Sequence, residues 1–330
     1  MTGYATIGVA GAGAWGTALA NTLARAGRRV ILWARHAPQA AALERDGENR
    51  SRLPGLRLDP AVAPSAALAD LAAAEAVLIA VPAQSMRALS SHLAPAIGEA
   101  CPVIVTAKGI ERETQCFMTE VVAQTLPRSR PAILSGPSFA KDVAAGLPTA
   151  VVIAAAAPDL ATELASALTS PTLRLYHTTD MRGVEIGGAA KNVLAIAAGI
   201  VEGSGLGDSA KAALTARGFA ELRRFASAFG ARPETLMGLS GLGDLMLSTS
   251  TPKSRNFAFG LALGRGEPLA TAAHGELAEG AFTAGVLVRM AHRAGVSMPI
   301  CEAVAAILEG KLSIPDAVTA LMNRPVRAEE

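Results

Sequence analysis

Residues 5–16 read Ala-Thr-Ile-Gly-Val-Ala-Gly-Ala-Gly-Ala-Trp-Gly, the most informative segment of the chain for its fold. Its first six residues form a short apolar run, which is typical of a buried strand in a parallel sheet. Gly11, Gly13 and Gly16 then match G-x-G-x-x-G. In that motif the first glycine makes a tight turn, the second lets a pyrophosphate reach the backbone, and the third lets strand and helix pack closely. A helix expected over residues 14–26 would present its free N–H groups to the phosphates, so the stretch predicts a dinucleotide site.

The same alternation of strand and helix continues to about residue 180. Short apolar runs predict strands at 29–33, 76–81, 102–106, 131–135, 149–155 and 172–177, and alanine-rich composition predicts a helix at 36–46. This order indicates an α/β fold with a Rossmann-type, doubly wound parallel sheet. Beyond it we expect only helices, at 181–201, 209–229, 255–263, 283–294 and 299–308. The chain is therefore predicted to have an NAD(P)-binding domain at 1–180 and an all-helical substrate and catalytic domain at 181–330.

The second strand gives a prediction about the cofactor. A strand that binds NAD usually ends in Asp or Glu, whose carboxylate binds the ribose 2′-hydroxyl. Here the strand is followed by Ala34, Arg35 and His36. Arg35 can pair with a 2′-phosphate, which favours NADPH over NADH. The alternative is a solvated arginine at a strand end.

Composition excludes several classes of function. The chain has 330 residues, is 51% hydrophobic and carries a net charge of +2 without a basic stripe, which argues against nucleic-acid binding. Cys101, Cys116 and Cys301 are widely spaced, so we expect neither a disulfide framework nor a metal site. The N-terminus lacks the pattern of a signal peptide, and apolar stretches such as 193–201 are shorter than the ~20 residues of a membrane span. We expect a cytoplasmic protein with no integral membrane segment.

One lysine lies where hydrophobic periodicity does not predict it. Residues 187–196 are small or apolar except for Lys191 and Asn192. A buried lysine is costly unless it is paired, and burial lowers its pKa, which makes it a usable proton donor. Asp244, in the sequence Gly-Leu-Gly-Asp, is a candidate partner that would hold the ammonium group. The alternatives are a surface lysine on an alanine-rich helix and an aspartate that begins a helix.

Three further segments supply polar groups that suit a phosphorylated substrate. Lys108 follows the strand at 102–106, where doubly wound sheets place their ligands. Residues 254–256 combine a hydroxyl, a guanidinium and a helix N-terminus, which together suit a phosphate. Residues 136–138 offer backbone and hydroxyl donors after another strand. The alternatives are a salt bridge from Lys108 to Glu111, Ser254 as an ordinary helix N-cap, and a plain turn at 136–138.

Taken in order, these and other segments resemble the bacterial type of NAD(P)-dependent glycerol-3-phosphate dehydrogenase. The resemblance runs over nearly the whole chain, through residues 11–20, 107–111, 134–140, 191–193, 198–199, 215–218, 241–245, 254–256 and 279–280. It departs from the family at Leu277, where a β-branched residue is common, and after Gly280, where a basic residue is common.

The resemblance implies reduction of dihydroxyacetone phosphate to sn-glycerol 3-phosphate with NAD(P)H, which supplies glycerophospholipid synthesis. It also implies a homodimer and a phosphorylated triose as substrate. The implied catalytic residues are Lys191, Lys108 and Asp244. The expected cofactor contacts combine the glycine turn with the residues implied by the resemblance: Gly11, Gly13, Ala14, Trp15, Gly16, Arg35, His36, Lys108, Ala140, Arg255, Leu277 and Glu279. The implied substrate contacts are Lys108, Gly136, Ser138, Lys191, Asn192, Asp244, Ser254, Arg255 and Asn256.

Two other functions are compatible with the same fold. A 3-hydroxyacid or ketopantoate-type dehydrogenase also uses a lysine on an early helix of its second domain, but Ser254-Arg255-Asn256 favours a phosphorylated substrate. A non-catalytic NAD(P)-binding sensor is the alternative of another class. The presence of Lys191, Asp244 and Lys108 together argues against it, because a sensor needs no proton donor.

Overall fold

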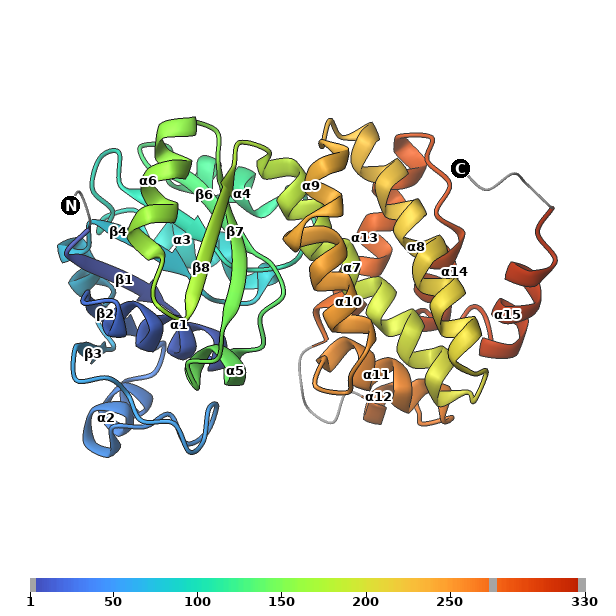
Figure 1. Cartoon of the computed structure of the whole chain (residues 1–330), viewed down its shortest axis with the longest axis horizontal. Coiled ribbons are helices and arrows are strands. Elements are labelled where there is room, and N and C mark those ends of the chain that lie inside the picture. Colours follow the sequence, from blue (N-terminus) through green and yellow to red (C-terminus); the bar gives the residue numbers. More distant parts are fainter. Residues whose placement is uncertain (1–3, 273–277, 326–330) are drawn as a thin grey trace.

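The chain folds into two domains that lie side by side, a sheet domain and a helical domain (Figure 1). We describe residues 4–272 and 278–325 from a computed structural model. The last strand of the sheet ends at Thr178, and the first helix of the second domain begins at Met181. The two domains therefore follow one another in the chain, and the junction between them is short.

The sheet domain is built on eight strands in the order β3-β2-β1-β4-β5-β6-β7-β8. All neighbouring pairs are parallel except β6 and β7, which are antiparallel. The parallel-dominated sheet confirms the predicted Rossmann-type fold, whereas the reversal at β7 was not predicted. The strands are β1 Thr6–Ala10, β2 Arg29–Trp33, β3 Val62–Ser65, β4 Ala76–Ile79, β5 Pro102–Val105, β6 Arg130–Ser135, β7 Thr149–Ala155 and β8 Leu173–Thr178.

Helices cover both faces of the sheet, because its central strands are apolar on both sides. Leu19 and Leu23 of α1 pack with Leu160 and Leu164 of α6 on one face. On the other face α3 and α4 join a second cluster that includes Met86. The helices of this domain are α1 Ala14–Arg25, α2 Ala37–Asp46, α3 Met86–Leu93, α4 Met118–Thr125, α5 Ala140–Ala144 and α6 Pro158–Leu168, with short 3₁₀ turns η1 Leu68–Ala73 and η2 Ala83–Ser85.

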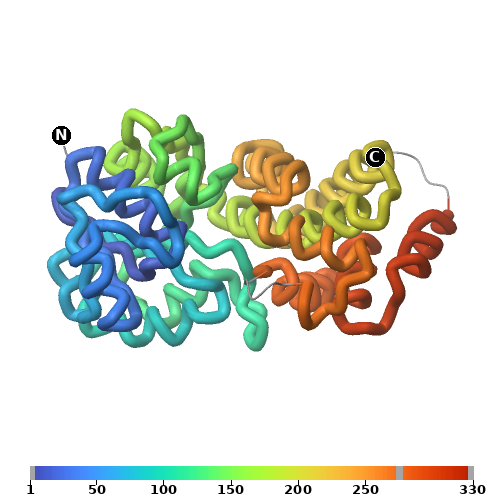
Figure 2. Tube along the Cα trace, turned by 90° about the horizontal axis from the view of Figure 1, so that it is seen from below, coloured from blue at the N-terminus to red at the C-terminus, as the bar shows by residue number. Residues whose placement is uncertain are grey.

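The second domain is helical throughout the part that the structure describes, as predicted. Its helices surround α7, and α15 lies at the end of the molecule farthest from the sheet (Figure 2). The elements are α7 Met181–Gly203, α8 Asp208–Ala228, α9 Pro233–Met237, a π-helical turn η3 Leu239–Gly243, α10 Asp244–Thr249, α11 Arg255–Gly264, α12 Leu269–Ala272, α13 Glu279–Arg293, α14 Pro299–Leu308 and α15 Ile314–Met322.

Helix α7 is the core of the helical domain. It has 23 residues and is apolar enough to cross a membrane by length and composition, which corrects the expectation that every apolar stretch is too short. Its most apolar window is, however, wholly buried inside the molecule. Such a helix is what a protein core requires when other helices surround it on all sides.

Candidate active site at the carboxyl ends of the strands

The glycine turn between β1 and α1 is tight at two positions and open at one. Gly11 has φ +128°, and a Cβ there would lie 2.4 Å from the carbonyl oxygen of Ala80. A Cβ at Gly16 would lie 1.8 Å from the carbonyl oxygen of Gly11. At Gly13 nothing lies within 4 Å of the Cβ position. The backbone is therefore open at the position where a pyrophosphate has to approach.

The first turn of α1 also suits an anion. The first N–H groups of a helix have no partner within it. No side chain in the described part of the chain caps them here, and Gly13 occupies the N-cap position. Open space beside unpaired N–H groups at a positive helix end fits the pyrophosphate of NAD(P).

Several of the predicted site residues follow strands that end at the same edge of the sheet. Arg35 and His36 follow β2 and are exposed, the glycine turn follows β1, Lys108 follows β5, and Gly136 follows β6. From β2 to β5 is three strand spacings, roughly 14 Å. An extended dinucleotide on this edge would reach from Arg35 to Lys108, so these two residues need not touch each other to serve one cofactor.

Lys191, Lys108 and Asp244 come from α7, the end of β5 and α10, and they meet at one point. Nζ of Lys191 donates to Oδ1 of Asp244 at 2.9 Å, and Nζ of Lys108 donates to Oδ2 at 2.7 Å. The Asp244 side chain is 1% exposed, against 8% for Lys191 and 19% for Lys108. Lys108 thus pairs with Asp244 and not with Glu111, which pairs with Arg87. Two ammonium groups share one buried carboxylate.

Burial and the neighbouring charges set the protonation of this cluster. Burial lowers the pKa of Lys191 to about 8, and the positive charges of Lys108 and Arg255 act in the same direction, against the attraction of Asp244. Burial acts to raise the pKa of Asp244, but the two lysines outweigh it and hold that pKa below its usual value. Near pH 7 the cluster therefore holds a carboxylate and a Lys191 ammonium group that gives up its proton readily.

A second hydrogen bond of Lys191 was not predicted from the sequence. Its Nζ also donates to Oγ of Ser248 at 2.6 Å, and Ser248 is 2% exposed. Ser248 lies four residues after Asp244 on α10, so both side chains lie on one face of that helix. This spacing is the sequence signal that would have identified Ser248.

The loop after β6 orients Lys108. The carbonyl oxygen of Gly136 accepts hydrogen bonds from Nζ of Lys108 at 2.9 Å and from Oγ of Ser138 at 3.0 Å. Gly136 has φ +138°, and a Cβ there would lie 3.0 Å from Cα of Val151. The glycine is therefore required for the loop to place its carbonyl oxygen beside Lys108.

A chain of hydrogen bonds joins the walls of the site. Nδ2 of Asn192 donates to the carbonyl oxygen of Lys108 at 3.1 Å, and Nδ2 of Asn256 donates to Oδ1 of Asn192 at 2.9 Å. The N–H of Gly280 donates to Oδ1 of Asn256 at 2.9 Å. The two amides thus connect the end of β5 with α7, α11 and α13. Each retains a second Nδ2 hydrogen, and their contacts with a substrate stay a prediction.

The predicted phosphate site begins α11. Ser254 is its N-cap, and Oγ accepts from the N–H of Phe257 at 3.4 Å, so the N-cap alternative is realised. Arg255 is the exposed first residue of the helix, and its charge is close enough to lower the pKa of Lys191. An anion bound beside Arg255 would therefore lie close to the lysine pair.

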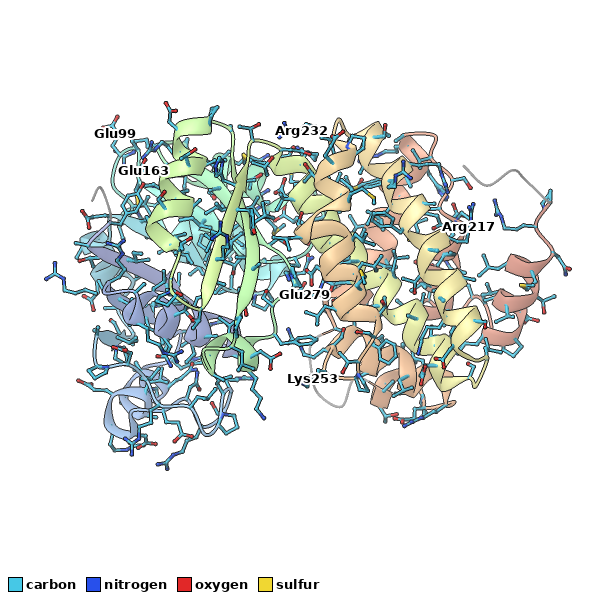
Figure 3. The ribbon with its side chains drawn as sticks, in the orientation of Figure 1. Glu99, Glu163, Arg217, Arg232, Lys253 and Glu279 are labelled. Carbon is cyan, nitrogen blue, oxygen red and sulfur yellow. The ribbon has the colours of Figure 1, made fainter. Side chains whose placement is uncertain are left out.

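Glu279 begins α13 and lies at the junction of the two domains (Figure 3). Its Oε1 accepts at 3.3 Å from the N–H of Ala83, the first residue of η2, which follows β4. Its Oε2 is buried without a hydrogen-bond partner among the described residues, and burial raises the pKa of this carboxyl. Ala140 begins α5 and packs with Trp15 against one small apolar cluster. The predicted contact at Leu277 lies outside the described residues.

Comparison with known proteins gives one family for both domains. Residues 6–161 match the N-terminal domain of NAD-dependent glycerol-3-phosphate dehydrogenase, and residues 180–319 match its C-terminal domain. The glycerol-3-phosphate dehydrogenase (NAD(P)+) of Azorhizobium caulinodans is 60% identical over 329 residues and covers 100% of both chains. That of Bradyrhizobium diazoefficiens is 59% identical over 330 residues, again with 100% of both chains covered.

Comparison with solved structures points to the same family. The crystal structure of glycerol-3-phosphate dehydrogenase from Coxiella burnetii matches with a TM-score of 0.92 and 37% identity, over 97% of this chain and 99% of that one. A ketopantoate reductase from Ralstonia eutropha reaches a TM-score of 0.59 at 18% identity, over 93% of this chain and 98% of that one. The second likeness is one of fold alone.

Proposed function

Because the chain belongs to the NAD(P)-dependent glycerol-3-phosphate dehydrogenase family, we propose that it reduces dihydroxyacetone phosphate to sn-glycerol 3-phosphate with Lys191 as the proton donor. Family membership makes the chain an oxidoreductase that uses NAD(P), and it sets aside both a ketopantoate-type dehydrogenase and a sensor. The direction of the reaction and the role of Lys191 are the proposal.

The observation that carries the proposal is the buried ammonium group shared with Asp244. Reduction of a ketone requires a hydride on the carbonyl carbon and a proton on the carbonyl oxygen. NAD(P)H, when bound, supplies the hydride. The Lys191 ammonium group polarises the carbonyl and then transfers a proton from Nζ to the alkoxide oxygen. With a pKa of about 8, it is charged before the step and a competent acid near neutral pH.

The neighbours of Lys191 suit this role. Asp244 and Ser248 hold Nζ at 2.9 and 2.6 Å and thereby fix the direction of the remaining hydrogen. Lys108 adds a second positive charge and Arg255 a third, whereas Asp244 is the carboxylate that pairs with the two lysines. The excess of positive charge favours a phosphorylated triose over a neutral ketone.

An assay of purified protein tests the proposal. NADPH should be oxidised when dihydroxyacetone phosphate is added, and Lys191→Ala should lower kcat by at least about a hundredfold, the contribution of a positioned acid. NADPH affinity of that variant should change little. Near-wild-type turnover by Lys191→Ala would reject the proton-donor role, and no turnover of dihydroxyacetone phosphate by the wild type would reject the substrate.

The remaining proposals concern the setting of the enzyme. We propose that the product supplies glycerophospholipid synthesis in the cytoplasm; the free state of Cys101, Cys116 and Cys301 supports a reducing compartment. We also propose a homodimer, on the family resemblance, and its molar mass is measurable by light scattering.

A further inference from the structure

One carbonyl group in the glycine turn accepts two side-chain hydrogen bonds. The oxygen of Ala12 accepts from Nε2 of Gln39 at 2.8 Å and from Nδ2 of Asn49 at 3.0 Å. Gln39 lies on α2, and Asn49 follows α2 in the segment that leads to β3. A carbonyl oxygen has two lone pairs, and here both are used. Neither side chain belongs to the G-x-G-x-x-G motif, and neither was predicted as part of the site.

Asn49 is itself held rigidly. It is 2% exposed, and its Nδ2 also donates to Oγ1 of Thr17 on α1 at 2.7 Å. Its Oδ1 accepts from Oγ of Ser51 at 3.3 Å, and its carbonyl oxygen accepts from the N–H of Leu53 at 2.7 Å. An amide with its donors fixed in this way can define the direction of the carbonyl group to which it donates.

The direction of the Ala12 carbonyl fixes the next N–H. In a planar trans peptide the C=O of one residue and the N–H of the next point in opposite directions. Two donors on the Ala12 oxygen therefore turn the N–H of Gly13 away from Gln39 and Asn49. Gly13 is the residue of the turn with open space beside it.

We propose that Asn49 and Gln39 are positioning residues for the cofactor, because they hold the Ala12–Gly13 peptide with its N–H toward the pyrophosphate before the cofactor binds. An amide that is already oriented loses less freedom on binding, so this contact raises affinity for any ligand that carries a pyrophosphate. The proposal rests on NAD(P) binding, not on the direction of the reaction.

Asn21 provides a matched control. It is fully buried on α1 and holds the same segment: its Nδ2 donates to the carbonyl oxygen of Arg57 at 2.8 Å, and its Oδ1 accepts from the N–H of Asp59 at 3.0 Å. None of these bonds reaches the glycine turn. Replacing Asn21 therefore loosens the same segment without releasing the Ala12 carbonyl.

The experiment compares Asn49→Leu, Gln39→Leu and Asn21→Leu with the wild type. Dissociation constants are measured without substrate, for NADPH by its fluorescence and for ADP by calorimetry. We expect Asn49→Leu to raise both constants about tenfold, which is about 1.4 kcal/mol. Gln39→Leu should raise both by a smaller factor, and Asn21→Leu should raise neither by more than about twofold. Because ADP has the pyrophosphate but no nicotinamide, equal factors for both ligands locate the effect at the turn. At saturating NADPH, kcat for reduction of dihydroxyacetone phosphate should change far less than the two dissociation constants.

Two results would overturn the proposal. One is a loss of affinity in Asn21→Leu equal to that in Asn49→Leu, which would make the effect one of segment anchoring. The other is unchanged NADPH and ADP affinity in both Asn49→Leu and Gln39→Leu. If Asn49→Leu does not fold, Gln39→Leu decides alone, because Gln39 is half-buried on α2 and donates to Ala12 without holding the segment.

Discussion

Lys191 keeps its charge in a buried position because each of its neighbours has a defined effect. Burial alone would drive the ammonium group towards the neutral form. Asp244 restores the charge, and its own second oxygen is bound by Lys108, so the carboxylate is shared. The result is an ammonium group whose pKa is low enough for proton transfer and high enough for charge near pH 7.

The pKa of Lys191 predicts opposite pH profiles for the two directions. Reduction needs the ammonium form, so kcat/KM for dihydroxyacetone phosphate should fall as pH rises through about 8. Oxidation needs the amine as a base, so kcat/KM for glycerol 3-phosphate should rise over the same range. Steady-state rates from pH 6 to 10 measure both. Asp244→Asn should move both transitions to lower pH, because Asp244 raises the pKa of Lys191; profiles that run in parallel would contradict the acid–base role.

The position of Arg35 predicts that the enzyme prefers NADPH to NADH. It is exposed at the end of β2, where a 2′-phosphate of the adenosine ribose would lie. Arg35→Ala should weaken NADPH binding by about 1–2 kcal/mol, the size of a partly exposed charge-assisted contact, and should change NADH binding little. Fluorescence titration with both cofactors measures this. Arg45→Ala, on the exposed side of α2, serves as the control, and equal losses for both cofactors in Arg35→Ala would remove the assignment.

Among the elements, α7 and α11 are notable for the glycines at their contact, which allow the two helix backbones to approach closely. A Cβ at Gly199 would lie 2.1 Å from the carbonyl oxygen of Phe257 on α11. A Cβ at Gly260 would lie 2.1 Å from the carbonyl oxygen of Ile196 on α7. The two helices therefore pack backbone against backbone at these points. Because α7 carries Lys191 and α11 carries Arg255, this close packing sets the distance between proton donor and phosphate site.

Gly199→Ala tests that contact. The added methyl group has no space, since the atom it meets is a backbone oxygen, so the helices must separate at a cost of about 1–3 kcal/mol in the free energy of unfolding. Urea denaturation measures the loss. Gly98→Ala is the control, because nothing lies within 4 Å of its Cβ position, and it should change stability by less than about 1 kcal/mol. An unchanged free energy of unfolding in Gly199→Ala would show that α7 and α11 are not closely packed at this point.

Short elements mark the limit of prediction from sequence. The strand β3 has four residues, Val62–Ser65, and includes Pro64, so it lacks an apolar run. Helix α5 has five residues, too few to show a helical period. The direction of β7 is a different case: this seven-residue strand was predicted, but it is as apolar as β6, with which it pairs antiparallel, so its direction leaves no local signal. The local sequence does not specify β3 and α5, so their contacts with the rest of the sheet domain decide their conformation.

At the scale of the whole molecule, Glu185 joins the two domains. It lies on α7, and its Oε1 accepts from the N–H of Thr119 on α4 at 2.8 Å and from Oγ1 of Thr119 at 2.9 Å. Arg182 lies 3.5 Å from its Oε2, and the Arg182 guanidinium stacks 3.7 Å from the centre of the Phe117 ring. This contact holds the helix that carries Lys191 against the sheet domain that carries Lys108.

Glu185 predicts a pH dependence of stability. Burial raises its pKa from 4.5 to about 7. The folded state therefore holds a proton that the unfolded state has lost between those values, and the free energy of unfolding should fall as pH rises through that window. In Glu185→Gln this part of the pH dependence should be absent. Urea denaturation at pH 5 and pH 8 measures it, with the exposed Glu99→Gln as control. Equal pH dependence in Glu185→Gln and the wild type would contradict the assignment.

The glycine turn, the two kinds of domain and the unusual position of Lys191 could all be predicted from the amino-acid sequence. These depend on local patterns: spacing of glycines, apolar period and a cation among small residues. Three features depend on how the chain packs: Lys108 pairs with Asp244 and not with Glu111, Ser248 is a partner of Lys191, and Gln39 and Asn49 donate to the carbonyl oxygen of Ala12. Those contacts join residues from different elements, most of them dozens of positions apart, and their geometry depends on how the packed helices and strands meet.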